Sequence, residues 1–353
     1  MKKLMKGNEA IAEAAVRGGC RFFAGYPITP QNEIPEYLSW RLFEVGGQFV
    51  QSESEVAAIN MVYGAAAAGT RAMTSSSSPG ISLKQEGFSY IAGAELPCVI
   101  INMVRGGPGL GGIQPAQSDY FQATKGGGHG DYHMLVYGPN SVQECVDILY
   151  NAFDKADEYR IPVMILGDGM LGQIMEAVEL PEMKDIEKLP KKDWAATGSG
   201  VGENRRIVNS LYIEPDALEE LNHRQFEKYD LIASRETRYE EYLCDDAELV
   251  LTAYGTVARI AKSAVNILRE QGIKAGLLRP VTLYPFPNEA FLKVANNPTV
   301  QRFVCSELSM GQMIEDVKLA IECKKPVDFF GRTGGNVMTP EDIVEFVKGE
   351  VKK

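Results

Sequence analysis

The sequence has few features of several common classes of protein. Its six cysteines are scattered without any CxxC pair, so this chain alone does not provide the ligands of an iron–sulfur cluster or a structural zinc site. No apolar run approaches the roughly 18 residues that a membrane-spanning helix needs. The first residues contain charged side chains where a signal peptide would be continuously apolar. We therefore expect reduced thiols, no membrane partner and a cytoplasmic location.

The chain is also poor in positive charge. It has 36 Lys and Arg against 47 Asp and Glu, which gives a formal net charge of −11. A nucleic-acid-binding protein would carry a basic stripe, and a protein docked on anionic lipid would carry a basic patch. Hydrophobic residues make up 45% of the 353 residues, enough for the cores of two domains. The composition indicates an acidic globular protein that does not bind nucleic acid.

Strand and helix patterns alternate over residues 1–178, and the strands are almost continuously apolar. Examples are residues 20–25 and 98–105 for strands and 142–159 for a helix with Ser141 as its N-cap. This pattern predicts a parallel sheet covered on both faces, with ligands beyond the carboxyl ends of its strands. Residues 179–246 are charged and predict a connector with short helices. Alternation resumes over residues 247–353, which predicts a second, smaller α/β domain.

Four side chains at predicted strand ends are candidates for chemistry. Glu53 and Glu55 lie where a strand passes into an Ala-rich helix, so either could be a helix-dipole partner or a carboxyl in a poorly hydrated pocket that shares a proton. Arg105 ends a buried strand beside glycines, where it could bind a carboxylate with two N–H donors or form a surface ion pair. Thr29 lies between two prolines, which either present its hydroxyl rigidly or only stiffen a turn.

Other motifs point to cofactors less convincingly. Residues 107–112 satisfy GxGxxG after a strand, but Pro115 lies where the helix of a dinucleotide site should begin. Residues 167–169 read GDG, which opens a magnesium motif in many thiamine-diphosphate enzymes, yet the closing Asn is missing. The His129 and His133 pair would suit a metal on a helix, but the surrounding glycines disfavour a helix. We expect no metal site on this chain.

Taken together, seven motifs resemble those of the 2-oxoacid:ferredoxin oxidoreductases. YPITP, SESEVAAINMVYGAAAAG, TSSSSPG and MVRGGPG are similar to the pyrimidine-binding domain of that family, and LRPVTLYPFP, CSELSMGQM and GRTGG to its second domain. The resemblance implies a thiamine-diphosphate-binding, pyrimidine-type parallel-sheet domain followed by a transketolase C-terminal-like α/β domain. It favours the branched-chain class, which acts on 2-oxoisovalerate, and leaves a 2-oxoglutarate-specific member as an alternative.

The resemblance also implies roles for particular residues. Glu55 matches the glutamate that hydrogen-bonds N1′ of the thiamine aminopyrimidine and so promotes loss of the C2 proton, after which C2 attacks the 2-oxo carbon. Glu53 is the weaker match. Thr29 and Arg105 match the threonine and arginine that contact the substrate. The remaining cofactor contacts would be Tyr26, Pro27, Ile28, Ser76, Ser78 and Gly80.

The incomplete magnesium motif and the absence of cluster-binding cysteine pairs predict a hetero-oligomer. The family places Mg²⁺ and the diphosphate on a partner subunit, and the iron–sulfur clusters on that subunit or another. Electrons from oxidative decarboxylation would pass to ferredoxin, and the acyl group to coenzyme A. Two readings from other classes stay open at this point: a non-catalytic assembly subunit that binds no cofactor, and a nicotinamide dehydrogenase.

Overall fold

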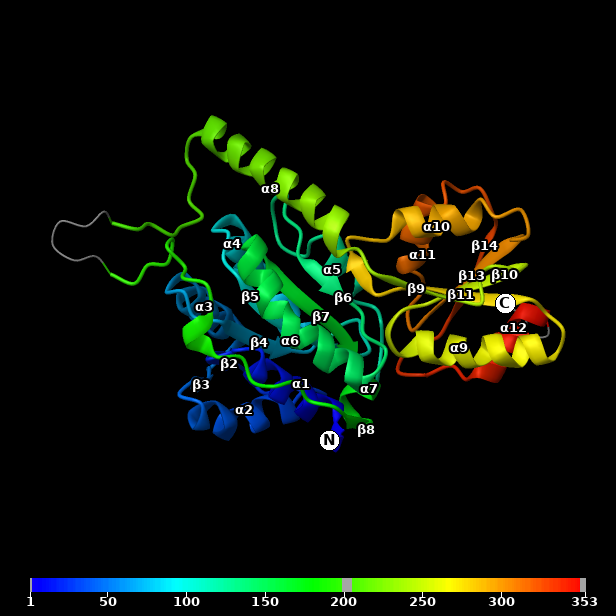
Figure 1. The fold of residues 1–353 in the computed structure, drawn as a ribbon, viewed down its shortest axis with the longest axis horizontal. Helices are drawn as coiled ribbons and strands as arrows, with labels where there is room; N and C mark the ends of the chain where they lie inside the picture. Colours follow the sequence, from blue (N-terminus) through cyan, green and yellow to red (C-terminus); the bar gives the residue numbers. More distant parts are fainter. Residues whose placement is uncertain (1, 199–204, 350–353) are drawn as a thin grey trace.

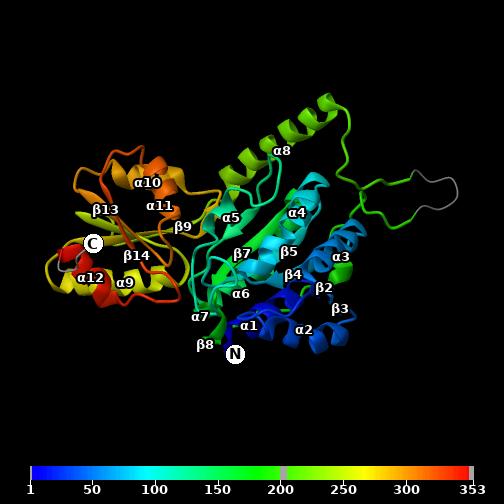
Figure 2. The same ribbon diagram turned by 180° about the vertical axis from the view of Figure 1, so that it is seen from behind.

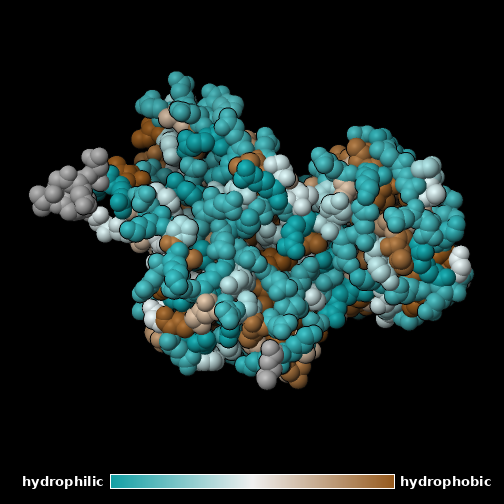
Figure 3. All heavy atoms as spheres, viewed as in Figure 1, coloured by the Kyte–Doolittle hydropathy of each residue, from teal (hydrophilic) through white to brown (hydrophobic). Residues whose placement is uncertain are grey.

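The computed structural model describes residues 2–198 and 205–349. A larger N-terminal domain and a smaller C-terminal domain lie side by side (Figure 1). In the space-filling view the C-terminal domain forms a distinct lobe, and the surface is mainly hydrophilic (Figure 3). Both domains consist of a largely parallel sheet with helices on its faces, as the alternating sequence pattern predicted.

The N-terminal domain is built on a seven-stranded sheet of order β12-β6-β7-β5-β4-β2-β3. All its strands run parallel except β12, which pairs antiparallel with β6. The central strands are fully buried because helices cover both faces. The strands are β2 (Phe22–Gly25), β3 (Gln48–Gln51), β4 (Ala72–Ser76), β5 (Cys98–Val104), β6 (Leu135–Tyr137), β7 (Pro162–Asp168) and β12 (Thr282–Tyr284).

Helices from both halves of the domain cover the two faces of this sheet. One face packs against α1 (Gly7–Arg17), α2 (Glu33–Glu44) and α6 (Val142–Tyr159), and the other against α3 (Glu55–Ala67) and α4 (Ser78–Gly93). The predicted cap of α6 is confirmed, since the Ser141 hydroxyl accepts from Glu144 N at 3.1 Å. Shorter elements complete the domain: α5 (Tyr120–Thr124), α7 (Gly169–Gln173), and an antiparallel pair of β1 (Lys3–Lys6) and β8 (Met175–Val178).

The segment predicted as a connector with short helices contains one long helix. After a single 3-10 turn (Ile186–Lys188), α8 (Pro215–Glu236) spans 22 residues and lies against the N-terminal domain (Figure 2). The Gln225 amide donates to Ala92 O at 3.0 Å, and the Lys228 ammonium pairs with Glu95 at 3.1 Å. The expectation of short helices was wrong because α8 is largely polar, with few buried side chains to give an apolar stripe.

The C-terminal domain contains a five-stranded sheet of order β14-β13-β10-β11-β9. Here β9 is antiparallel to β11 and the other strands are parallel. Thr339 caps α12, with Pro340 in the first turn: the Thr339 hydroxyl accepts from Asp342 N, and the Asp342 carboxylate accepts from Thr339 N. The elements are β9 (Tyr239–Tyr242), β10 (Leu249–Thr252), β11 (Ala275–Pro280), β13 (Arg302–Glu307), β14 (Val327–Gly331), α9 (Gly255–Glu270), α10 (Asn288–Ala295), α11 (Met313–Ala320) and α12 (Pro340–Lys348).

Two strands cross the boundaries proposed from the sequence. β9 lies in the predicted connector yet joins the C-terminal sheet, and β12 lies in the predicted second domain yet completes the N-terminal sheet. Membership of the sheets therefore does not follow the divisions at 178 and 246. The exchange of strands ties the two domains together.

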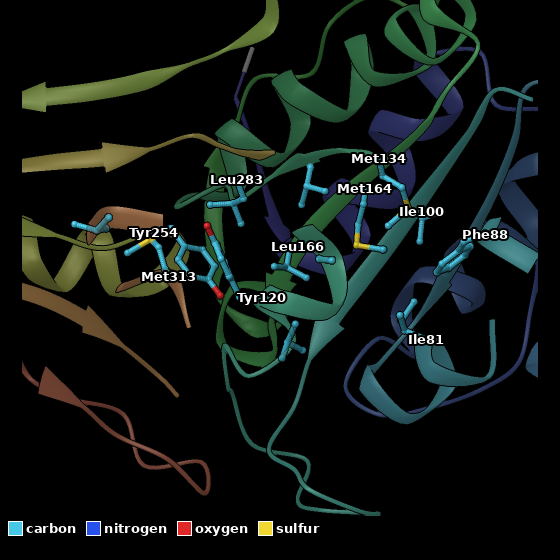
Figure 4. Close-up of a cluster of buried hydrophobic side chains, with 14 of the residues drawn as sticks. Ile81, Phe88, Ile100, Tyr120, Met134, Met164, Leu166, Tyr254, Leu283 and Met313 are labelled. Carbon is cyan, nitrogen blue, oxygen red and sulfur yellow. The ribbon is translucent and has the colours of Figure 1, made fainter. Parts of the chain in front are cut away.

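A shared apolar core also joins the domains. One continuous cluster runs from α4 through Tyr120 to Tyr254 and Met313 of the C-terminal domain (Figure 4). The rings of Tyr120 and Tyr254 are 5.6 Å apart, and the Tyr120 hydroxyl donates to Asp316 at 2.6 Å. Buried polar and apolar contacts of this kind fix how the loops of one domain face the strand ends of the other.

Candidate functional site

The predicted site residues gather at the carboxyl edge of the N-terminal sheet. The four neighbouring strands β5, β4, β2 and β3 run parallel, so their carboxyl ends lie next to one another. The loop with Thr29 follows β2, the turn to Glu55 follows β3, Ser76 ends β4 and Arg105 follows β5. The sheet therefore assembles residues that are as much as 76 positions apart in the sequence.

Glu55 is the first residue of α3 and its side chain is buried, whereas that of Glu53 is exposed. The helix begins here because the Ser54 hydroxyl accepts from Ala57 N at 3.2 Å. Within the described residues, no protein group donates a hydrogen bond to the Glu55 carboxyl. A buried carboxyl without a protein donor is available to a ligand that can supply one.

The carboxyl of Glu55 lies against a glycine of the neighbouring helix. A Cβ at Gly80 would be 2.6 Å from Glu55 Oε1 and 2.1 Å from Ser76 Oγ. The hydroxyls of Ser76 and Ser77 are buried and have no hydrogen-bond partner in the part of the chain that the structure describes. The absence of a side chain at Gly80 thus leaves room for the carboxyl beside polar atoms whose hydrogen bonds are unfilled, an arrangement that fits a nitrogen heterocycle.

Arg105 is buried at the end of β5 and holds two loops. Nη1 donates to Thr29 O at 3.0 Å and Nη2 donates to Leu110 O at 2.9 Å. Its backbone N–H donates to Ser78 Oγ at 3.1 Å, which joins β5 to the start of α4. The buried Nε has no partner among the described residues, so three of the five N–H donors of the guanidinium are unused by the protein.

The turn after β2 presents its side chains in different ways. Tyr26 and Pro27 are exposed, and Ile28 and Thr29 are half-buried. The Thr29 hydroxyl accepts from Asn32 Nδ2 at 3.2 Å, so its own hydrogen is free to be donated. The peptide bond between Thr29 and Pro30 is cis. The exposed part of this turn is the part that a second polypeptide could cover.

Two hollows lie beside these residues, and both are lined from both domains. One, of about 540 Å³, is lined by Thr29, Ile113, Met170 and Val337, among others. The second, of about 470 Å³, is lined by Arg105 and by a set of smaller contacts: Ser78, Asp119, Ser309, Met310 and Thr333. Sequence reasoning did not place the C-terminal residues here, although the SELSMGQM and GRTGG motifs contain several of them.

The other motifs have structural explanations. The Asp168 carboxylate accepts from Met170 N and Leu171 N, so it caps α7. Residues 107–112 form a loop that leads to no long helix, unlike a dinucleotide fingerprint. His129 and His133 lie outside any helix, and His133 stacks on Tyr284 at 4.1 Å. Among the described residues, no three metal-ligating side chains of His, Cys, Asp or Glu gather in one place.

One buried residue escaped the sequence analysis. Lys84 on α4 has no exposed surface, and its ammonium donates to Thr74 Oγ1 at 2.8 Å and Ser75 O at 3.0 Å. Lysine is rarely buried completely. The available signal was its helical spacing, since the residues three and four positions away on either side, Gly80, Ile81, Gly87 and Phe88, are all small or apolar.

Comparison with known proteins places the chain in a family. Residues 13–241 match the family described as "Pyruvate flavodoxin/ferredoxin oxidoreductase, thiamine diP-bdg", and residues 247–343 match "Pyruvate:ferredoxin oxidoreductase core domain II". The chain therefore belongs to the 2-oxoacid:ferredoxin oxidoreductases, and it is an alpha-type subunit of such an enzyme. The resemblance inferred from the motifs is confirmed, and its first domain is of the thiamine-diphosphate-binding type.

Individual relatives refine this placement. The chain is 50% identical to ketoisovalerate oxidoreductase subunit VorB of Methanothermobacter marburgensis over 98% of its own length and 97% of the relative's. It is 37% identical to 2-oxoglutarate synthase subunit KorA of Methanothermobacter thermautotrophicus, over 97% of each chain. Both are subunits, so the chain is part of a multi-subunit oxidoreductase.

Solved structures show the same architecture. A 2-oxoglutarate:ferredoxin oxidoreductase from Magnetococcus marinus, with 2-oxoglutarate, coenzyme A and succinyl-CoA bound, superposes with a TM-score of 0.83 at 27% identity. The match covers 99% of this chain and 65% of that one. A split-gene transketolase shares the fold alone, with a TM-score of 0.60 at 15% identity. Within the described residues, every helix is too short or too polar to span a bilayer.

Proposed function

We propose that this subunit supplies the pyrimidine-binding half of the thiamine diphosphate site in a branched-chain 2-oxoacid:ferredoxin oxidoreductase. The reaction would convert 2-oxoisovalerate and coenzyme A to the acyl-CoA and CO₂, with two electrons passing to ferredoxin. The observation that carries the proposal is the Glu55 carboxyl, which is buried at the sheet edge beside Gly80 and Ser76 without a protein donor.

The proposed division of labour follows from what the residues offer. Thiamine diphosphate would supply a nucleophilic carbon and an electron sink. Glu55 would hold a proton at N1′ of the pyrimidine, and Thr29 and the free donors of Arg105 would bind the carboxylate of the oxoacid. Tyr26, Pro27 and Ile28 would line the cofactor together with Ser76, Ser78 and Gly80. A partner subunit would hold the diphosphate and Mg²⁺, and that subunit or another would carry the iron–sulfur clusters.

The charge of the two hollows supports a branched-chain substrate. Arg105 is the single cationic side chain that lines either hollow within the described residues, and Glu33 and Asp119 are the acidic ones. A 2-oxoglutarate molecule has a second carboxylate, which would need a second cation when buried. The apolar tail of 2-oxoisovalerate would instead fit against side chains such as Ile113, Met170 and Val337.

The proposal is tested by two neighbouring glutamates. In the complex reconstituted with its partner subunits, Glu55→Gln should reduce 2-oxoisovalerate-dependent reduction of a viologen dye by at least about a hundredfold, in line with the loss of a proton-transfer group. The exposed Glu53→Gln should leave the rate unchanged. Size-exclusion chromatography checks assembly. An assembled Glu55→Gln complex with full turnover would make this chain a non-catalytic assembly subunit.

The substrate is tested with a panel of oxoacids. The wild-type complex should give its highest kcat/KM with 2-oxoisovalerate and lower values with 2-oxoglutarate and pyruvate. A preference for 2-oxoglutarate would favour the alternative drawn from the KorA relatives and would locate the missing cation on the partner subunit. Parallel reduction of NAD would be expected only of a nicotinamide dehydrogenase.

A further inference from the structure

A buried lysine lies on α4, the helix whose Gly80 contacts the candidate carboxyl. Lys84 lies four residues after Gly80 on α4, so the two positions share one helix face and their Cβ positions are about 5–6 Å apart. The Glu55 carboxyl lies against Gly80. Lys84 Nζ donates to Ser75 O, and the adjacent Ser76 hydroxyl lies against the same Gly80 position as the Glu55 carboxyl, so the ammonium and the carboxyl are both buried at the end of β4.

The ammonium is fixed by the strand that ends at the site. Lys84 Nζ donates to Thr74 Oγ1 and Ser75 O, and the Thr74 hydroxyl in turn donates to Ala24 O at 2.7 Å. The Ser75 hydroxyl donates to the buried amide oxygen of Gln31, which belongs to the turn of Thr29. A single network thus links Lys84 to the end of β4, to β2 and to the turn that follows β2.

Glu55 is the charged group that acts on this lysine. Burial lowers the pKa of Lys84 to about 7, and the negative charge of Glu55 opposes that effect. Two other ions lie at the start of α4, where Arg105 N donates to Ser78 Oγ and the Asp119 carboxyl accepts from Ser78, but Glu55 is the charged group that acts on Lys84. The Cys98 thiol of β5 and the Tyr63 phenol of α3 have raised pKa values because they are buried, and the Asp168 carboxyl of β7 caps α7. On α4 itself, Glu86 is exposed and accepts from Tyr90.

We propose that Lys84 is a positioning residue that acts through Glu55, its ammonium attracting the carboxyl and keeping it in place against Gly80. The inference rests on the proposed role of Glu55 and assigns Lys84 a supporting role beside it. A buried cation near a carboxyl would keep that carboxyl oriented toward the polar atoms around Gly80, where a ring nitrogen of the cofactor would bind. The alternative is that Lys84 only tethers α4 to β4 through its two hydrogen bonds.

Two substitutions separate charge from tethering. Lys84→Gln removes the charge but keeps an N–H donor for Thr74 or Ser75, whereas Lys84→Met removes both at a similar length. In the reconstituted complex, the positioning role predicts that both variants move the acid limb of turnover to higher pH, because an opposite charge near a carboxylic acid favours its ionised form; the shift expected for a buried nearby charge is about one to two pH units. If Lys84 is only a tether, Lys84→Gln keeps the wild-type limb.

Thermal unfolding without cofactor tests whether Glu55 in turn affects the protonation of Lys84. Because the folded-state pKa of Lys84 lies below its unfolded value, the unfolded chain binds more protons between about pH 7 and 10. The stability contributed by this group therefore rises with pH over that window. Thermal unfolding of the full chain should show this rise, and Glu55→Gln should move its onset to lower pH, since binding effects are reciprocal. Glu53→Gln should leave the onset unchanged.

The outcomes distinguish this inference from the proposed function. If Glu55→Gln abolishes turnover but neither Lys84 variant moves the acid limb, the inference is wrong and the role of Glu55 stands. If Glu55→Gln retains turnover, the proposed function itself fails. Should the Lys84 variants not fold, the onset measured in Glu55→Gln decides: an unmoved onset overturns the coupling between the two residues.

Discussion

Arg279 of the C-terminal domain is clamped to Glu144 of the N-terminal domain by two hydrogen bonds. Nη1 and Nη2 of Arg279, on β11, donate to the two carboxylate oxygens of Glu144 at 2.8 and 2.6 Å. The arginine is buried, and its Nε is also 3.1 Å from the Glu240 carboxylate. This fork-to-fork pair joins the first turn of α6 to the second sheet, and it therefore helps to hold the two walls of the hollows in register.

Removal of this arginine should destabilise the protein strongly. Arg279→Met leaves two carboxylates without their cation in a largely buried site, and we expect a loss of about 3 kcal/mol in the free energy of unfolding. Arg259 is the matched control, because it also pairs across the domains, with Glu176, but is half-exposed. Arg259→Met should cost less than about 1 kcal/mol. Denaturant unfolding of both variants checks the comparison, and equal losses would contradict it.

The Arg279–Glu144 pair also predicts that the stability of the protein decreases at acidic pH. Burial raises the pKa of Glu144, but the hydrogen bonds and charge of Arg279 outweigh it and hold the pKa below its usual value. A lowered folded-state pKa gives stability that is present above the unfolded value, about 4.3, and is lost as pH falls through the folded value. Melting curves from pH 7 to pH 3 should show this loss. In Glu144→Gln the acid-dependent part should be smaller.

Gly80 should tolerate no side chain. Gly80→Ala would place a methyl group 2.6 Å from Glu55 Oε1, so the carboxyl has to move from its position. We expect turnover of the reconstituted complex to fall at least about tenfold, with a stability loss of about 1–3 kcal/mol from overpacking. Gly64→Ala on α3 is the control, because a Cβ there meets open space. Similar kinetics in the two variants would mean that the position of Glu55 does not matter.

Arg105 should not be replaceable by lysine. An ammonium cannot bridge Thr29 O and Leu110 O while also binding a carboxylate with two N–H groups. Arg105→Lys should therefore raise the KM for the oxoacid by about tenfold or more, which corresponds to about 1.4 kcal/mol or more. The exposed Arg235→Lys on α8 should leave KM unchanged. An unchanged KM in Arg105→Lys would remove this residue from the substrate site.

Much of the fold could be predicted because its elements have strong local signals. Strands such as β5 and β7 are almost continuously apolar, and α6 begins after a Ser that caps it. The missed elements have weak signals: β6 and β12 are three residues each, and α8 is largely polar. The pairing of β6 with β12 joins residues more than 140 positions apart, which no local pattern contains.

The candidate site, like the fold, has parts that the sequence indicated and parts that it did not. The motif containing Glu55 was recognisable, and the strand order explains why Thr29 and Arg105 lie near it. Two features could not be read from the chain. Burial of Lys84 depends on how α4 packs on β4, and the contribution of Met310 depends on how the second domain is docked. Both arise from tertiary packing rather than from local sequence.

The exchange of β12 into the N-terminal sheet has a consequence for biosynthesis. When the first 246 residues have left the ribosome, the edge of β6 that β12 will cover is still bare, and β9 has no sheet to join. The nascent chain must therefore keep an open backbone edge until residue 284 has emerged. A fragment that stops before that point would expose the unpaired backbone edge of β6. Only the nearly finished polypeptide can cover that edge.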